Sequence, residues 1–172
     1  MFLLLAVVLS AAGFAHGAIA RSPLAQRVEL ALVYLVAGYF GLTMLVVGVF
    51  CLVAPARAAG MLGAEPGNPF ELFLGWAFCG MALAALLAVR LRGAYLVGPI
   101  AAWSVDFFGA VHVHWVEYAA GGRLSPRFAA FIVLVHAGPP LLAIVLGLWL
   151  WRLGIQLGDD GAVPCEDSPV AS

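Results

Sequence analysis

The sequence predicts an all-α membrane protein, a polytopic bundle of about five transmembrane helices. Of its 172 residues, 65% are hydrophobic and only 10% are charged, and the mean hydropathy is +1.07. A water-soluble domain carries about a quarter charged residues, because its surface faces water. The apolar residues also come in runs of roughly 20, the length that an α-helix needs to cross about 30 Å of hydrocarbon. The natural solvent of this chain is therefore the lipid bilayer.

Five runs qualify as spans, and short joints that are polar or rich in glycine separate them. The runs cover residues 2–20, 28–54, 70–89, 94–115 and 128–151. The chain accordingly divides into a first span or signal peptide at 1–20 and a helical bundle at 21–157. It ends in an acidic tail at 158–172, "GDDGAVPCEDSPVAS", whose composition is typical of disorder.

The first run has two interpretations. It contains no charge, as expected for a span, but Ala18, Ile19 and Ala20 before Arg21 resemble a signal-peptidase site. A signal peptide usually begins with a basic region, which "MFLLL" lacks, so we favour a retained span. Cleavage would leave four transmembrane helices.

The arginines predict the orientation of the bundle. With five spans, five arginines fall on one side of the membrane and three on the other. Because cytoplasmic loops carry the excess of basic residues, we expect an external N-terminus and a cytoplasmic C-terminus in a bacterial inner membrane. The larger group is Arg21, Arg27, Arg90, Arg92 and Arg152, and the smaller group is Arg57, Arg123 and Arg127.

Small residues and prolines indicate how the spans pack. Gly38, Gly41 and Gly48 recur in the second span, and Gly75 and Cys79 form a small-xxx-small pair in the third. Such residues let helix backbones approach closely, within one chain or in a homo-oligomer. Prolines at 99, 139 and 140 remove backbone donors, so we expect them to bend or loosen the fourth and fifth spans.

Charge and cysteine patterns exclude several classes of protein. A net charge of −1 gives no basic surface for nucleic acid. The three cysteines form no CxxC pair, so neither a disulfide framework nor a zinc site is indicated. Cys51 and Cys79 are expected to be small packing residues. The chain also has no haem-attachment or dinucleotide motif, and the sequence assigns no cofactor and no catalytic residue.

Asp106 is the most informative residue for function. It falls near the middle of the fourth span, where an ionised carboxylate costs at least about 2.5–3.5 kcal/mol. It can be a neutral or hydrogen-bonded residue that joins two helices, or a group that carries protons or coordinates a ligand. Both interpretations stay open at this stage.

Helical geometry sorts the polar residues that follow it in "FFGAVHVHWVEY". At about 100° per residue, Glu117 lies on the face of Asp106, about 20° round, and His114 lies about 80° away. His112 points about 120° to the other side. The two histidines therefore cannot chelate one ion while the segment is helical, because helical ligand pairs need i,i+3 or i,i+4 spacing.

Two further residues fall at a similar depth. His136 lies about two turns into the fifth span, and Glu71 lies at the start of the third. If the fourth and fifth spans pack antiparallel, one outward-facing crevice can hold five titratable side chains. They are Asp106, His114, Glu117, His136 and Glu71. Such a group could bind a proton, a metal ion or a small ligand. The alternative is that these residues have no binding role. Polar side chains are common where a span meets the lipid headgroups, and Glu71 can stabilise the N-terminus of its helix.

At this point the sequence resembles a family of small bacterial membrane proteins known only as a domain of unknown function. The likeness runs from about residue 28 to residue 150. It rests on "LGAEPGNPFELFLG" at 62–75, "GAVHVHW" at 109–115 and "GGRLSPR" at 121–127. A looser likeness to DoxX-type membrane bundles concerns architecture only.

The resemblance implies roles for some residues. Pro69 and Phe70 match the family's entry into its third helix, and Glu71 would stand for a nearby family glutamate. His112 or His114 would occupy the position of the family histidine. His136 lies where the family has an aspartate, and the loop before it lacks the usual asparagines. The family brings no known activity.

Three functions remain as hypotheses. The first is a binding protein with a polar outer crevice that serves as an accessory or transport subunit. The second is a structural or partner-binding membrane protein that uses its glycine faces. The third, a redox subunit with haem or quinone, lacks any motif in its favour.

Overall fold

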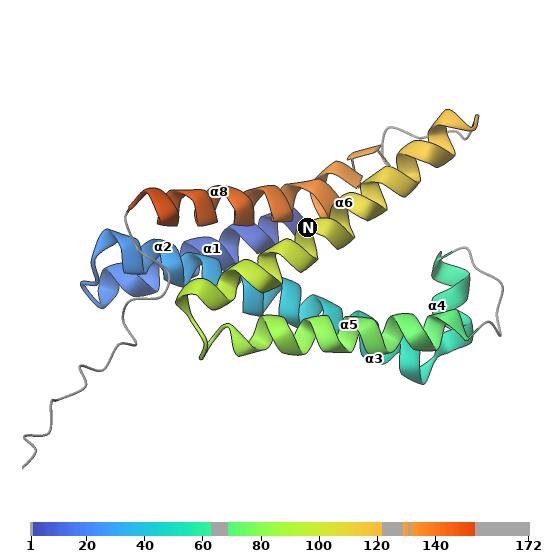
Figure 1. Cartoon of the computed structure of the whole chain (residues 1–172), viewed down its shortest axis with the longest axis horizontal. Coiled ribbons are helices and arrows are strands. Elements are labelled where there is room, and N and C mark those ends of the chain that lie inside the picture. The colour runs from blue at the N-terminus through green and yellow to red at the C-terminus, as the bar shows by residue number, and fades with distance from the viewer. Residues whose placement is uncertain (1, 63–68, 122–128, 131, 154–172) are drawn as a thin grey trace, which may run out of the picture.

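The structure, a computed structural model, describes residues 2–62, 69–121, 129–130 and 132–153, and all the regular secondary structure there is helical (Figure 1). Four helices are long and apolar enough to cross a membrane, which confirms the predicted helical bundle. They are Leu24–Val53, Phe70–Leu87, Gly93–Val116 and Ile132–Arg152. The predicted tail lies outside the described residues.

The first predicted span is α1 (Phe2–Ile19), a shorter apolar helix that packs along the next one. The second span is one continuous helix with a wider middle. It consists of α2 (Leu24–Val33), the π-helix η1 (Tyr34–Gly41) and α3 (Leu42–Val53). It begins at residue 24 rather than 28. Pro23 directly precedes the first turn, where a backbone N–H would have no helical acceptor, so a helix can start after this proline without losing a hydrogen bond.

The remaining elements follow in the predicted order. A short helix, α4 (Pro55–Leu62), precedes α5 (Phe70–Leu87), and the 3-10 turn η2 (Gly93–Leu96) leads into α6 (Val97–Ala119). The last span comprises the π-helix η3 (Ile132–Ala137) and α8 (Gly138–Arg152).

Prolines affect the fourth and fifth spans differently. The last span is loosened as predicted: η3 ends directly before Gly138, and Pro139 and Pro140 cannot donate to the carbonyls four residues earlier. The expectation for Pro99 is wrong, because α6 is continuous around it. Pro99 is the third residue of α6, close to the start of the helix, where a proline is tolerated.

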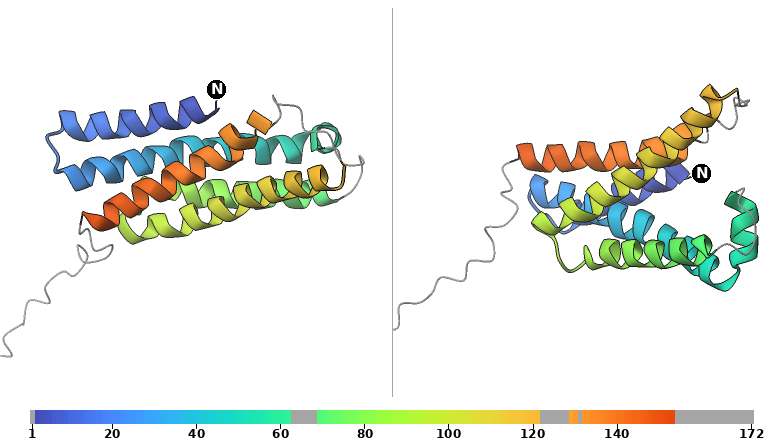
Figure 2. Two further views of the ribbon diagram at one scale, coloured as in Figure 1. Left: turned by 90° about the horizontal axis from the view of Figure 1, so that it is seen from above. Right: turned by 45° about the vertical axis from the view of Figure 1, so that its right-hand side comes forward.

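The long helix 24–53 joins two groups of helices. Its α2 part packs against α1 and α8, whereas its α3 part packs against α5, and η1 contacts both α1 and α5. The two groups lie close together at one end of the molecule. At the other end, α6 and η3 diverge from α3 and α5, as two views show (Figures 1 and 2).

Aromatic side chains fill the centre of the bundle. Phe40 of η1 stacks on Trp103 of α6, with ring centroids 4.8 Å apart. Phe107 lies 5.9 Å from Phe40 and 5.2 Å from Trp103, and Tyr39 extends the cluster on the other side of Phe40. All four are buried.

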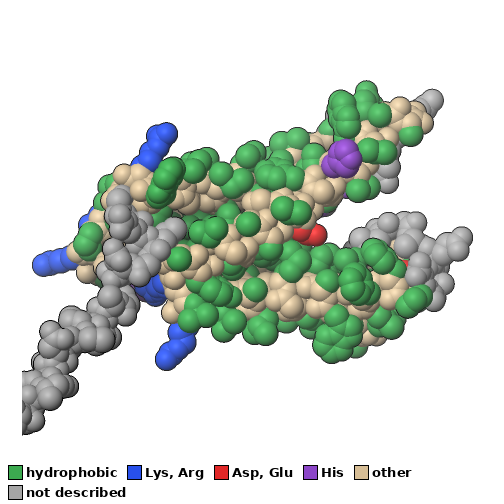
Figure 3. Space-filling model, viewed as in Figure 1, with side chains coloured by type: hydrophobic (Ala, Val, Ile, Leu, Met, Phe, Trp, Pro, Cys, Tyr) green, Lys and Arg blue, Asp and Glu red, His purple; other side chains and the backbone are tan. Residues whose placement is uncertain are grey.

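The described arginines mark the two ends of the bundle. The five of the larger predicted group lie in the α1–α2 joint, the first turn of α2, the α5–η2 joint and the end of α8, which meet at one end. Figure 3 shows the basic side chains gathered there. We call this the Arg-rich end. Arg57 lies on α4 at the opposite, Arg-poor end, and Arg123 and Arg127 lie outside the described residues.

Close backbone contacts hold α3 to α5 at the predicted Gly48, Gly75 and Cys79, and α1 to α2 at Gly13, which was not predicted. The predicted Gly38 and Gly41 instead contact side chains of other helices. A Cβ added at Gly48 would lie 2.9 Å from the backbone nitrogen of Cys79 and 2.9 Å from the carbonyl oxygen of Gly75. One added at Gly13 would lie 2.5 Å from the carbonyl oxygen of Leu30. The two cysteines within the described residues are free, and Cys51 is buried against the same α3–α5 contact, which agrees with a packing role.

We expect Gly13→Ala and Gly48→Ala each to lower the thermal unfolding temperature in detergent, because overpacking costs typically about 1–3 kcal/mol. Gly80→Ala and Gly147→Ala are the matched controls, since nothing lies within 4 Å of a Cβ at either position. These controls should stay unchanged or gain stability, because Ala favours a helix over Gly by about 0.8–1.0 kcal/mol. Equal losses in all four variants would contradict the packing described here.

Candidate functional site

Three polar contacts close the bundle at the Arg-rich end. The Glu29 carboxylate accepts a hydrogen bond from the backbone N–H of Gly93 at 2.9 Å and thus ties α2 to η2. The Tyr95 hydroxyl donates to the carbonyl oxygen of Ala84 at 2.8 Å and ties η2 to α5. Near the same end, the ring nitrogen Nδ1 of His16 lies 2.9 Å from the Tyr34 hydroxyl.

Beyond the Tyr95 contact, α5 and α6 separate and leave a groove of about 560 Å³. We call it the α5–α6 groove. Small side chains make most of its walls, so no bulky side chain fills the space between the two helices. Its lining residues are Gly80, Met81, Ala84, Ala94, Tyr95, Gly98, Pro99, Ala102 and Trp103.

Asp106 lies one helical turn beyond this groove, toward the Arg-poor end. It follows Ala102 by four residues and Trp103 by three, so the three side chains share one side of α6. This side faces α5, because both earlier residues line the groove. Figure 3 shows acidic side-chain atoms at the inner end of the opening between α6 and the α3–α5 pair.

The carboxylate of Asp106 lacks a partner within the described part of the chain. The side chain is half-buried, and no hydrogen bond or ion pair joins it to another described residue. An intramembrane carboxylate normally pairs with another group or faces a water-filled cavity. Asp106 fits the second case, because it has no described partner and lies one helical turn beyond the α5–α6 groove.

Trp103 is a second polar group on this side of α6. Its side chain is 1% exposed, and its indole N–H has no hydrogen-bond acceptor among the described residues. A buried indole N–H usually finds an acceptor. Trp103 thus adds a buried, unsatisfied donor to the wall of the α5–α6 groove, less than one helical turn from Asp106.

The structure brings two of the predicted histidines together. The rings of His114 on α6 and His136 on η3 have centroids 5.8 Å apart, and His136 also lies 5.7 Å from Phe107. These contacts place His136 at a depth between Asp106 and His114, as the sequence predicts. The fourth and fifth spans do run antiparallel and in contact (Figure 1).

The other predicted residues lie apart from this pair. Glu71 is 1% exposed and precedes Gly75 by one turn, on the face of α5 that packs against α3. Its two carboxylate oxygens have no hydrogen-bond partner among the described residues. His112 is exposed and lies about 180° round α6 from Trp103. The side chain of Glu117 lies outside the described residues, although its backbone belongs to α6.

Asp106 and the histidine pair are therefore neighbours on α6 rather than one cluster. About two helical turns separate Asp106 from His114, and the histidine contacts η3 while Asp106 faces α5. Within the described residues, no group of three His, Cys, Asp or Glu side chains has the geometry to hold a metal ion.

Comparison with known families supports the predicted resemblance. The chain matches DUF6790, a family of unknown function, over residues 1–155. It belongs to this family. The DUF6790 match includes α1 and all four long helices, so it extends beyond the residues on which the sequence resemblance rests. No curated protein and no solved structure matches the chain significantly. The likeness to DoxX-type bundles stays a prediction.

Sequence reasoning missed the contribution of Trp103. The residue lies in an uninterrupted apolar run, where an aromatic side chain is expected to pack in the core or against lipid. Its i,i+3 relation to Asp106 was the available signal, because it places the indole and the carboxylate on one side of the helix.

The contrast between two carboxylates gives a prediction. Asp106→Ala should leave the unfolding temperature unchanged or raise it, because it removes a carboxylate that has no described partner and that costs about 2.5–3.5 kcal/mol at mid-membrane. Glu29→Ala should lower it, because a hydrogen bond to a charged group contributes about 1.5–3 kcal/mol. Thermal unfolding of the two purified variants in the same detergent checks this. A loss in Asp106→Ala as large as that in Glu29→Ala would contradict the unpaired carboxylate.

Proposed function

We propose that this protein is a small binding protein of the bacterial cytoplasmic membrane, an accessory or transport subunit whose ligand is a proton or a small cation held by Asp106. The single observation that carries this proposal is the half-buried carboxylate in the middle of a membrane span, one helical turn beyond the α5–α6 groove and without a described partner. Intramembrane carboxylates that face a cavity are typical of ion and proton pathways.

The surroundings of Asp106 favour entry from the Arg-poor end. The helices diverge there, whereas the Tyr95 hydrogen bond and the Glu29–Gly93 contact close the other end. His114 and His136 lie nearer to the Arg-poor surface than Asp106, on the side of α6 that faces η3, and can bind protons or water there. The groove itself is almost wholly apolar, so the carboxylate is its main attraction for a cation.

The arginine distribution supports an outward-facing entrance. All five described arginines of the Arg-rich end would lie on the cytoplasmic side by the positive-inside rule. The N-terminus and the Arg-poor end would then face outward. The same rule puts the end of α8 in the cytoplasm.

Orientation can be measured with single cysteines in a chain whose native cysteines are replaced by alanine. Arg57→Cys should react with a membrane-impermeant maleimide on intact cells, and Arg152→Cys should react only after the cells are permeabilised. Both positions are exposed, so either one can react once the reagent reaches it. The reverse pattern of labelling would refute the proposed orientation.

The ligand proposal predicts how Asp106 reacts with dicyclohexylcarbodiimide, a membrane-permeant reagent that modifies protonated carboxyl groups. Peptide mass spectrometry should find the label on Asp106 in membranes. Labelling should fall as the pH rises, because only the protonated carboxyl reacts, and should also fall when sodium or methylammonium is added at constant ionic strength. Asp106→Asn should remove this label.

Glu71 is the internal control, since it is 1% exposed and packs between α3 and α5. It should react slowly, and its labelling should not change with added cation. If Asp106 stays unlabelled, or if neither pH nor cation changes its labelling, the proposal is wrong.

A second candidate function is supported by the small residues of the α5–α6 groove. Gly80, Ala84, Gly98 and Ala102 leave room for the backbone of another helix, from a second copy or from a partner protein. Asp106 would then lie at the contact. The carbodiimide experiment separates the two cases: a bound helix would block Asp106 in native membranes and release it after purification in detergent.

A further inference from the structure

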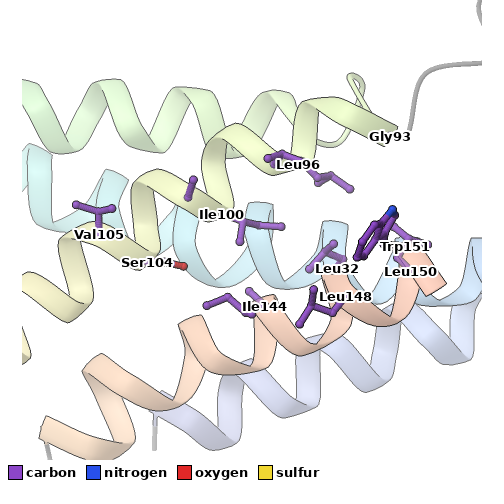
Figure 4. Close-up of a pocket in the computed structure, with 14 residues that line it drawn as sticks. Leu32, Gly93, Leu96, Ile100, Ser104, Val105, Ile144, Leu148, Leu150 and Trp151 are labelled. Atoms are coloured by element: carbon purple, nitrogen blue, oxygen red, sulfur yellow. The ribbon is translucent and has the colours of Figure 1, made fainter. Parts of the chain in front are cut away.

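A second groove lies on the opposite side of α6, between α6 and α8. It encloses about 490 Å³, and Leu32 of α2 forms part of its floor (Figure 4). We call it the α6–α8 groove. It plays no part in the function proposed above. Its walls come from η2 and α6 on one side, with Leu96, Ile100 and Ser104, and from α8 on the other, with Ile144 and Leu148.

The lining of this groove is apolar along nearly its whole length. Its polar exception is Ser104, whose hydroxyl oxygen is buried and has no hydrogen-bond partner among the described residues. Figure 4 shows that oxygen directed into the space between the two helices. A groove of this kind matches a long, narrow and apolar occupant and offers almost no hydrogen bonds to a polar one.

The rim of the α6–α8 groove lies on the lipid-facing flank of the bundle. Val105 is 75% exposed and Trp151 is 69% exposed, and Val97 and Leu148 are also exposed. Such bulky rim residues keep a second helix at a distance, because tight helix contacts in membranes use small residues. A flexible hydrocarbon chain can enter between them. The rim therefore favours an acyl chain over a partner helix.

Charge at one end of the groove indicates the kind of headgroup. Gly93 and Trp151 line the groove at the Arg-rich end, and the exposed residues Arg92 and Arg152 directly adjoin them in the chain. Tryptophan side chains prefer the level of the lipid headgroups. Arginine binds phosphate oxygens with its planar guanidinium group, so an anionic headgroup at this level would have two cationic partners.

We propose that the α6–α8 groove binds an anionic glycerophospholipid from the leaflet at the Arg-rich end, with one acyl chain between α6 and α8 and the headgroup phosphate near Arg92 and Arg152. The occupant is a bilayer lipid and not a free phosphate compound. Most of the contacts are apolar and need an acyl chain, whereas the two arginines can bind only the headgroup at one end of the groove. One lipid per chain is expected.

The wild-type protein tests the position of the chain. Purified protein in nanodiscs is irradiated with phosphatidylglycerol that carries a diazirine in one acyl chain, and the labelled peptides are identified. We expect label on residues 97–105 and 141–148, and a reduction when unlabelled phosphatidylglycerol is added. Glycerol 3-phosphate, which has the phosphate but no chains, should not compete. Label spread evenly over all the described helices would overturn the proposal.

Variants test the groove and the headgroup separately. Native mass spectrometry in detergent should show one phosphatidylglycerol bound roughly tenfold or more tightly than phosphatidylcholine with the same chains. Gly147→Phe, which fills the groove, should abolish this binding, whereas Gly80→Phe fills the α5–α6 groove and should leave it unchanged; a Cβ at either glycine has nothing within 4 Å. Arg92→Ala combined with Arg152→Ala should reduce phosphatidylglycerol to the affinity of phosphatidylcholine.

Each contrary result removes one part of the proposal. Unchanged lipid binding in a folded Gly147→Phe variant would exclude the groove, and equal affinities for the two lipids in the wild type would exclude the anionic headgroup. Loss of a dimer, rather than of a lipid, in Gly147→Phe would show that a helix occupies the groove and overturn the proposal. If Gly147→Phe fails to fold, the photolabelling of the wild type still decides.

Discussion

The stack of Phe40 on Trp103 is the contact on which the arrangement of α6 depends. Trp103 has ring contacts with both Phe40 and Phe107, and this aromatic cluster joins α6 to the middle of the long helix 24–53. Elsewhere α6 packs mainly against α8 and η3 and only weakly against α5. Between these contacts, α6 leaves space on two flanks, one toward α5 and one toward α8.

Both grooves follow from that constraint. On one flank, Trp103 lines the α5–α6 groove, and Asp106 lies one turn farther along the helix. On the other flank, Ser104 and Val105 line the α6–α8 groove. The two flanks of α6 therefore carry the two proposals, a cation at the Asp106 carboxylate and a lipid chain in the apolar α6–α8 groove. Because the flanks are separated by the body of α6, filling one groove should leave the other intact.

The two π-helical stretches serve this arrangement in different ways. η1 carries Tyr39 and Phe40 into the centre and allows one helix to pack on α1 in its first part and on α5 in its last. η3 places His136 against Phe107 and His114, directly before the prolines that weaken the helix. π-helical turns are frequent at functional sites, and here both lie beside the aromatic cluster that supports α6.

The sequence by itself determined the membrane bundle, the order of the spans and the family, and it indicated Asp106 as a candidate site residue, because hydropathy, span length and one mid-membrane charge are local properties of the chain. Counting residues along the spans also placed His136 at a depth between Asp106 and His114. The tertiary structure alone decided which neighbour each polar residue faces. The sequence grouped Glu71 with Asp106 by depth, but Gly75 and Cys79 turn that face of α5 toward α3. The depth of a residue follows from counting along its helix. The partner that it faces depends on how far the helix is rotated about its own axis. Close contacts, such as that of Gly48 with Gly75, set this rotation.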